Sequence, residues 1–140
     1  MKLSTRSRYG MRILVDIARN HQTGPVQIGD IALRQNISVK YLEQLVRPLK
    51  KAKLVSSVRG PRGGYIMAQS PTKITLGQVV RIFEGASDIV AGEDASGSDE
   101  MEDDSQVQIA WKNATAAMRA ELDTITISDL SHGKLSTTKT

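Results

Sequence analysis

The stretch ISVKYLEQLVRPLKKAKLVSSVRGPRGGY, residues 37–65, decides the fold. Its first half has apolar side chains at the spacing of an amphipathic helix, and this helix is expected to begin at Ser38. The side chains predicted to be buried are Leu42, Leu45, Val46 and Leu49. The opposite face is basic and polar. Because Pro48 removes a backbone donor within the helix, a kink or an early weakening is expected near Arg47.

The second half of the stretch predicts a β-hairpin. Residues 54–58 and 65–67 are short runs typical of strands, and RGPRGG, residues 59–64, joins them. The glycines of this connection can adopt the positive φ angles that a tight turn needs. Arg59 and Arg62 would therefore lie at the tip of a positively charged wing.

Two helices are predicted before this stretch. Apolar side chains recur at helical spacing over residues 5–20, and TGP at 23–25 stops that helix. A short second helix around Ile31 ends at Gln35 and Asn36, directly before the helix that begins at Ser38. The order of helix, tight turn and helix predicts a helix-turn-helix.

After the hairpin, Thr75 followed by Gln78 predicts a capping box that opens a fourth helix ending near Gly85. Residues 91–105 contain seven acidic side chains and are expected to form a mobile loop before a long amphipathic helix. The predicted fold is mainly α with a small β-hairpin. It divides into a winged helix-turn-helix domain over 1–85, an acidic loop over 86–105, a dimerisation helix over 106–130 and a disordered tail over 131–140.

The long helix carries an apolar stripe that a small domain cannot cover completely. The stripe consists of Val107, Trp111, Ala114, Met118 and Leu122. The same helix of a second copy is the predicted partner, which makes the protein a homodimer. The alternative is that the stripe packs within a single chain.

Charge is divided between the two halves of the chain. Residues 1–73 contain 14 Lys and Arg against 3 Asp and Glu, whereas residues 74–140 contain 5 against 12. A basic half favours a polyanion such as nucleic acid, and a merely solvated basic face is the alternative.

The sequence also argues against several other classes of protein. It has no cysteine, which excludes a thiol nucleophile or a thiolate metal site. His21 and His132 are too isolated in sequence to propose a zinc or catalytic pair. An enzyme is not expected, because no activated nucleophile, acid/base pair or metal cluster can be assembled from the residues. No signal peptide or membrane span is evident, and a soluble cytoplasmic protein without a membrane partner is expected.

The start of the third helix offers side chains suited to base edges in the major groove. Glu43 favours sequence selectivity, because phosphates repel a carboxylate; the alternative is that it pairs with Arg47 at i+4. The predicted base-reading residues are Ser38, Val39, Lys40, Tyr41, Glu43 and Gln44. Arg59 and Arg62 are predicted to enter the minor groove, and Arg8 and Lys51 to contact phosphates.

Three segments resemble the Rrf2 family of winged-helix transcriptional regulators, of the IscR and CymR type: MKLSTRSRYGMRIL at 1–14, the stretch at 37–65, and TLGQVVRIFEG at 75–85. The resemblance covers nearly the whole chain. It implies a homodimer joined by the C-terminal helix, which binds a roughly palindromic operator in double-stranded DNA. By position, Ser38, Tyr41, Glu43 and Gln44 match the base-reading helix of the family, and Arg59 matches its minor-groove wing.

Many members of this family hold a 2Fe–2S cluster on three cysteines in the loop before the long helix. Ala91, Ser98 and Ser105 stand at those positions here. No metal or cofactor is therefore expected in this chain, and a 2Fe–2S cluster is expected only in a cysteine-containing parent. Two explanations stay open: a naturally cluster-free member, or a form in which the three cysteines have been replaced.

The predicted function is a sequence-specific DNA-binding transcriptional regulator. The resemblance points to a repressor of the iron–sulfur, redox or cysteine-responsive type, in a cluster-free form. The alternative is a dimeric winged-helix module that binds proteins and has no specific DNA binding.

Overall fold

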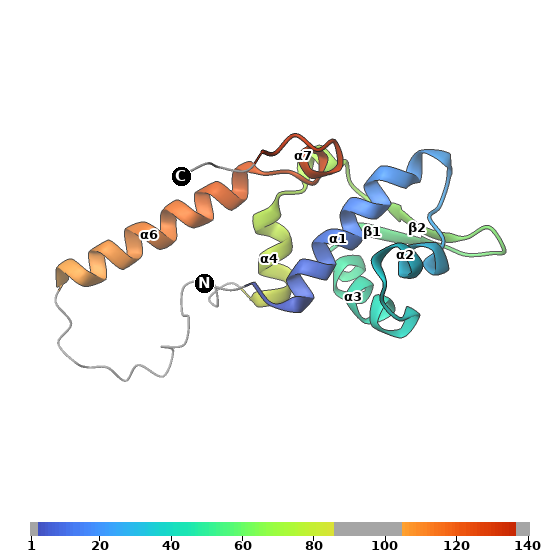
Figure 1. Cartoon of the computed structure of the whole chain (residues 1–140), viewed down its shortest axis with the longest axis horizontal. Coiled ribbons are helices and arrows are strands. Elements are labelled where there is room, and N and C mark those ends of the chain that lie inside the picture. Colours follow the sequence, from blue (N-terminus) through green and yellow to red (C-terminus); the bar gives the residue numbers. More distant parts are fainter. Residues whose placement is uncertain (1–2, 86–104, 137–140) are drawn as a thin grey trace.

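The structure, a computed structural model, describes residues 3–85 and 105–136. Its elements in chain order are α1 (Thr5–Asn20), η1 (His21–Thr23), α2 (Ile28–Gln35), α3 (Val39–Lys51), β1 (Val55–Val58), β2 (Gly64–Met67), η2 (Pro71–Lys73), α4 (Leu76–Glu84), α6 (Ser105–Thr124) and α7 (Ile127–Ser131) (Figure 1). Helices predominate and the two strands form one antiparallel hairpin. The predicted fold class is thus confirmed.

The core lies around α1, which contacts α2, α3, α4, α7 and β2. All four side chains that the pattern assigned to the buried face of the third helix are at most 1% exposed. They pack with fully buried residues of the neighbouring elements, namely Ile13, Leu14, Ile17, Ile31, Ile74 and Val79. Each such side chain stabilises the fold by roughly 1.5–3 kcal/mol relative to its exposed state. The core therefore fixes which face of α3 remains outside.

Polar side chains fix the helix ends at the predicted positions. The Ser38 hydroxyl accepts a hydrogen bond from the Tyr41 backbone N–H at 3.0 Å and so starts α3. Thr75 and Gln78 form the predicted capping box of α4. Between α2 and α3, Asn36 has a φ of 54° in the left-handed region, which turns the chain sharply. The predicted helix-turn-helix is therefore present.

Pro48 does not end the third helix, because α3 continues to Lys51. The prediction that the helix weakens early, near Arg47, is therefore wrong, because the helix extends four residues beyond Arg47. Proline costs about 3 kcal/mol inside a helix. Leu45, three residues before Pro48, and Leu49, directly after it, are both completely buried, so tertiary packing outweighs the lost backbone hydrogen bond.

The C-terminal region corrects the prediction of a single helix over 106–130. α6 ends at Thr124, and the next two residues run beside the segment that precedes α4. The Leu76 N–H donates to the Ile125 carbonyl at 2.8 Å, and the Ile127 N–H donates to the Ile74 carbonyl at 2.9 Å. These bonds cannot form on a continuous helix, so the chain leaves α6 and returns to the body.

The short helix α7 then packs against α1. A second capping box, Thr126 with Asp129, starts it, and Ile127 is completely buried. The segment expected as a disordered tail over 131–140 thus begins inside a helix, and residues 137–140 lie outside the described part. Most of the predicted acidic loop over 86–105 also lies outside it. Among the described helices, none combines the length and apolarity needed to cross a membrane.

Candidate nucleic-acid interface

The outer face of α3 is polar and accessible. Glu43 and Gln44 are exposed in the middle of the helix, and Lys51 is exposed at its end. The first turn is also exposed, with Ser38, Val39 and Lys40. Five of the six predicted base-reading residues therefore lie together on the surface around the start of α3.

Tyr41, the sixth predicted residue, is only half-exposed. Its ring meets the Tyr9 ring of α1 edge to face, with 5.9 Å between centroids. It also lines a hollow of about 490 Å³ beside α3, together with three cations: Arg6, Arg47 and Lys51. Tyr41 thus joins α3 to α1 next to a positively charged depression.

Among the described residues, Glu43 has no ion-pair partner. Within residues 3–85 and 105–136, the ion pairs are Arg34 with Asp16 and Arg81 with Asp123. The alternative in which Glu43 pairs with Arg47 is therefore not observed. The Glu43 carboxylate lies near Tyr65, whose pKa is raised by burial and, to a smaller extent, by this negative charge. Glu43 is free to face a ligand.

The wing is anchored to the body at its base. Val26 and Tyr65 exchange backbone hydrogen bonds of 2.8 and 2.9 Å, so β2 pairs with the segment before α2 as well as with β1. Arg59 and Arg62 are exposed in the connection between the strands. Figure 1 shows this connection at the end of the molecule opposite α6. A hydrogen-bonded base thus supports two exposed guanidinium groups.

Gly64→Ala tests this anchor. A Cβ at Gly64 would lie 2.2 Å from the Val26 carbonyl oxygen, and its φ of 155° already disfavours a side chain. We expect a loss of about 1–3 kcal/mol in the free energy of unfolding, measured in urea. Gly29→Ala in α2 is the control, because a Cβ there meets nothing within 4 Å; it should be neutral or stabilising by about 0.5–1 kcal/mol. Equal stability of the two variants would contradict the anchor.

A buried carboxylate holds α2 against α1. Asp16 is 5% exposed and accepts hydrogen bonds from Arg34 Nε at 2.9 Å and Arg34 Nη2 at 2.7 Å. The Gln35 amide donates a third at 2.9 Å. Sequence reasoning missed this group, because nothing in the local pattern shows which acid will be buried. It fixes the first helix of the helix-turn-helix and hence the position of α3.

Arg8, which the sequence predicts to contact a phosphate, is exposed on α1. The start of α1 is tied to the end of α4, because Glu84 accepts hydrogen bonds from the Ser4 N–H at 2.7 Å and the Ser7 hydroxyl at 2.8 Å. Hydrogen bonding from the Ser4 side chain is the main cause that lowers the pKa of Glu84, against the opposing effect of burial. The neighbouring Arg6 lies over the Phe83 ring at 5.7 Å.

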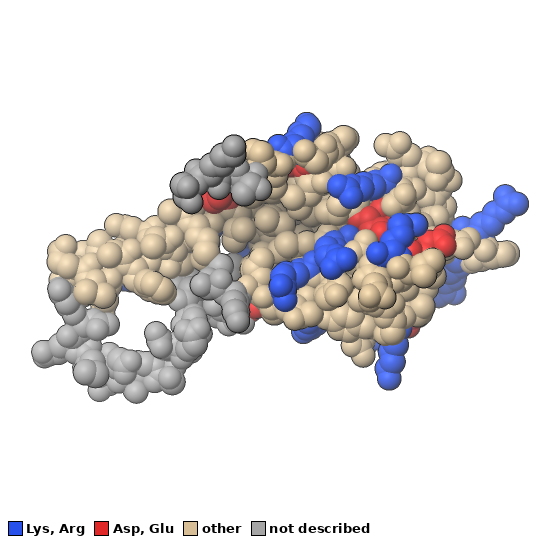
Figure 2. Space-filling view, viewed as in Figure 1, with Lys and Arg blue, Asp and Glu red and all other residues tan. Residues whose placement is uncertain are grey.

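The predicted dimerisation stripe is exposed at its beginning. Val107 is 60% and Trp111 65% exposed, and Ala114 is also exposed. Met118 and Leu122 are half-buried, and α6 packs against α4. In Figure 2, the visible surface of α6 is almost free of charged side chains, whereas Lys and Arg gather over the winged-helix body. The stripe residues Val107, Trp111 and Ala114 are thus uncovered in the single chain.

No metal site forms among the described residues, which contain no group of three or more His, Cys, Asp or Glu side chains in suitable positions. Ser105 is the first residue of α6, and Ala91 and Ser98 lie outside the described part. The structure does bring His21 and His132 to one hollow, beside Arg19. Both side chains line this hollow, and no metal-binding group includes them among the described residues.

Comparison with known proteins agrees with this geometry. The Rrf2 family, described as iron-dependent transcriptional regulators, matches residues 3–133. The transcriptional regulator CymR of Bacillus subtilis is 38% identical over 131 residues, covering 93% of this chain and 89% of that protein. The regulator IscR of Klebsiella pneumoniae is 35% identical over 130 residues, covering 93% and 79%.

A solved structure shows the same fold. The structure of CymR, the global cysteine regulator of Bacillus subtilis, superposes with a TM-score of 0.82 at 35% identity, covering 94% of this chain and 97% of that one. A helix-turn-helix with an arginine-bearing wing and these relatives favour a DNA-binding regulator over a module that binds only proteins. This chain belongs to the Rrf2 family of transcriptional regulators.

Proposed function

We propose that this regulator binds a palindromic operator as a homodimer, with α3 of each copy in a major groove. One observation carries the proposal: α3 has one face sealed in the core, while Lys40, Glu43 and Gln44 are exposed on the other. Side chains of these types match base edges, since Gln pairs with adenine, Glu accepts from cytosine and Lys reaches guanine. Ser38 and Val39 precede them at the helix start.

The wing and the flanking cations would add affinity and register. Arg59 and Arg62 extend from an anchored hairpin, and guanidinium groups are attracted to a narrow minor groove. Arg8 and Lys51 are exposed on α1 and α3 and are proposed to contact phosphates. Tyr41 is proposed to lie at the edge of this surface, because its ring packs against Tyr9 and is only partly exposed.

The apolar stripe of α6 supports the dimer. Val107, Trp111 and Ala114 are exposed, so the same helix of a second copy can cover them. Met118 and Leu122 continue the stripe toward the body. Two copies joined in this way present two α3 helices, and a twofold axis between them requires a palindromic site.

A 2Fe–2S cluster does not fit this chain. Such clusters are held mainly by cysteine thiolates, and the sequence contains no cysteine. We propose that the chain represents the cluster-free state of the family. The proposed output is repression of transcription, by a protein located in the cytoplasm. Family membership gives no reason to expect catalysis.

Two substitutions distinguish recognition of specific bases from non-specific electrostatic attraction to DNA. Glu43→Ala is expected to change affinity for operator variants unequally, by about 1–3 kcal/mol at the base pair that Glu43 reads. Lys51→Ala should weaken binding to all duplexes by a similar factor. The slope of log affinity against log salt concentration should fall by about one, because one phosphate contact and its released counterion are lost. Gel shifts of the operator and of single-base variants at several salt concentrations measure both effects.

A uniform response of all duplexes to Glu43→Ala would contradict direct reading by this residue. Equal affinity of the unaltered protein for promoter and random DNA would contradict the proposed function as a whole. Salt-sensitive binding to an acidic protein, without preference among duplexes, would instead support the protein-interaction module.

A further inference from the structure

We propose that the hollow between α1, α2 and α7 binds a small organic carboxylate and that its occupancy alters operator affinity; the second part rests on the proposed function. The hollow has a volume of about 480 Å³. This size is within the range of small-molecule pockets, roughly 300–1,000 Å³. Nothing in the DNA-binding scheme uses it.

The lining combines an apolar floor with a cationic rim. Met11 and Val15 of α1 and Leu130 of α7 supply the apolar part. The charged side chains around them are Arg12, Arg19, Arg34 and Asp16. Three guanidinium groups thus face one carboxylate, and that carboxylate is already paired with Arg34. The rim keeps an excess of positive charge.

Arg12 and Arg19 carry this excess. In the described part of the chain neither forms an ion pair. Arg12 donates from Nε to the Gln35 side-chain oxygen at 2.9 Å and lies 4.9 Å from the Tyr9 ring centroid. Arg19 donates to the Ser131 carbonyl at 3.0 Å and to the Leu130 carbonyl at 3.1 Å. Neutral partners therefore orient both side chains without cancelling their charge.

This chemistry selects the class of ligand. A guanidinium binds a carboxylate through two parallel hydrogen bonds, and its planar shape makes the pair specific. The apolar floor adds affinity for a hydrocarbon body, which inorganic anions lack. A short aliphatic acid satisfies both parts of the lining.

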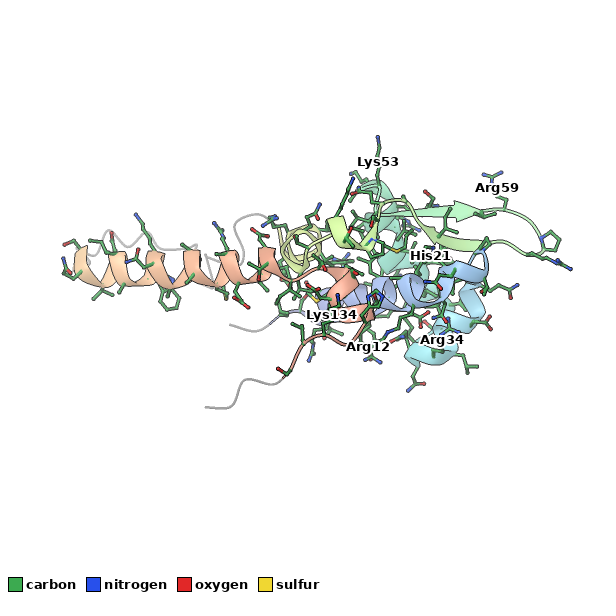
Figure 3. All side chains as sticks on the ribbon, turned by 90° about the horizontal axis from the view of Figure 1, so that it is seen from above. Arg12, His21, Arg34, Lys53, Arg59 and Lys134 are labelled. Carbon is green, nitrogen blue, oxygen red and sulfur yellow. The ribbon has the colours of Figure 1, made fainter. Side chains whose placement is uncertain are left out.

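The position of the hollow links two functional parts of the protein. Arg34 and Gln35 belong to α2, the first helix of the helix-turn-helix, whereas Leu130 belongs to α7, directly after the proposed dimerisation helix. Figure 3 shows Arg12 and Arg34 on the opposite side of the body from Lys53 and Arg59. A ligand there would not compete with DNA for the wing. It would act by favouring one placement of α2 relative to α7.

Binding is tested first on the full chain without DNA, so that its failure is separate from failure of operator binding. Straight-chain acids of two to eight carbons, and their uncharged primary amides, are titrated at millimolar concentration while methyl signals are followed by NMR. We expect hexanoate to shift the signals of Met11, Val15 and Leu130 to saturation and hexanamide not to do so. If no acid shifts them, or if amides shift them equally, the carboxylate site is wrong.

Arg12→Gln should weaken hexanoate about tenfold or more, because it removes a charged hydrogen-bond donor. Arg12→Lys should recover part of the affinity. Lys73→Gln, which removes an exposed charge outside the hollow, is the matched control and should leave binding unchanged. Circular dichroism confirms that each variant is folded. Equal weakening by Lys73→Gln would show that general charge, not this hollow, attracts the acid.

The coupling is tested with operator DNA. Saturating hexanoate is expected to change operator affinity of the unaltered protein by at least about fivefold, the lower range of allosteric coupling. Arg12→Gln should reduce this response at a hexanoate concentration that just saturates the unaltered protein, because its weaker site is then only partly filled. Unchanged operator affinity with the hollow saturated would overturn the coupling.

Discussion

Trp111→Glu is expected to make the protein monomeric and to lower its affinity for a palindromic operator by at least about 100-fold. Trp111 is 65% exposed in the single chain and belongs to the apolar stripe of α6. Between two copies of this helix a carboxylate would be buried without a partner, which costs several kcal/mol. A monomer binds one half-site at a time. It therefore loses the increase in effective concentration that a second, tethered DNA-binding domain provides. Analytical ultracentrifugation and gel shifts measure the two effects.

Asn113→Glu is the matched control, since it places the same charge on the same helix. Asn113 is exposed and, by helical spacing, lies away from the stripe. This variant should stay dimeric and bind the operator normally. Neither substitution touches the core residues around α1, so both variants should keep their helical content. A Trp111→Glu protein that is still dimeric would refute the assignment of α6.

Local patterns predicted the elements whose signals are complete within a few residues. The buried face of α3, the Ser38 cap and the Thr75–Gln78 capping box each follow from spacing or from one side chain next to a helix start. The break after Thr124 was missed although a similar signal is present: Thr126 and Asp129 also form a capping box. The apolar spacing across Ile125 looked continuous, and a helix period cannot show that Ile127 pairs with Ile74.

The residues of the candidate DNA-binding surface also fall into those that a local pattern predicts and those that it does not. Exposure of Lys40, Glu43 and Gln44 follows from the face of α3 opposite the core. The groups that hold this helix in place could not be inferred, because they join distant parts of the chain. Val26 meets Tyr65 across 39 positions of sequence, and Asp16 meets Arg34 across 18. Such partners depend on how helices pack, which the local pattern leaves open.

Arg34→Ala is expected to lower the free energy of unfolding by about 2–4 kcal/mol, because it leaves a buried carboxylate without its cation. The Asp16 side chain is 3% exposed. After the substitution its remaining hydrogen bonds would come from Gln35 at 2.9 Å and Asn20 at 3.4 Å. Arg34 itself is 42% exposed. Water can therefore enter at its place and solvate the carboxylate, which brings the expected loss of stability closer to about 2 kcal/mol than to about 4 kcal/mol. Urea unfolding at neutral pH measures it.

Arg81→Ala provides the contrast, since the Arg81–Asp123 pair spans 3.3 Å with both side chains more than 40% exposed. Breaking an exposed pair should cost no more than about 1 kcal/mol. Arg34→Lys should recover only part of the stability, because an ammonium group cannot bridge both oxygens of Asp16. The Arg34 variants should also bind the operator more weakly than Arg81→Ala does, since α2 supports α3. If Arg34→Ala and Arg81→Ala lowered the free energy of unfolding equally little, water would have to solvate the Asp16 carboxylate once Arg34 is removed. The burial of this carboxylate could then not be what positions α3.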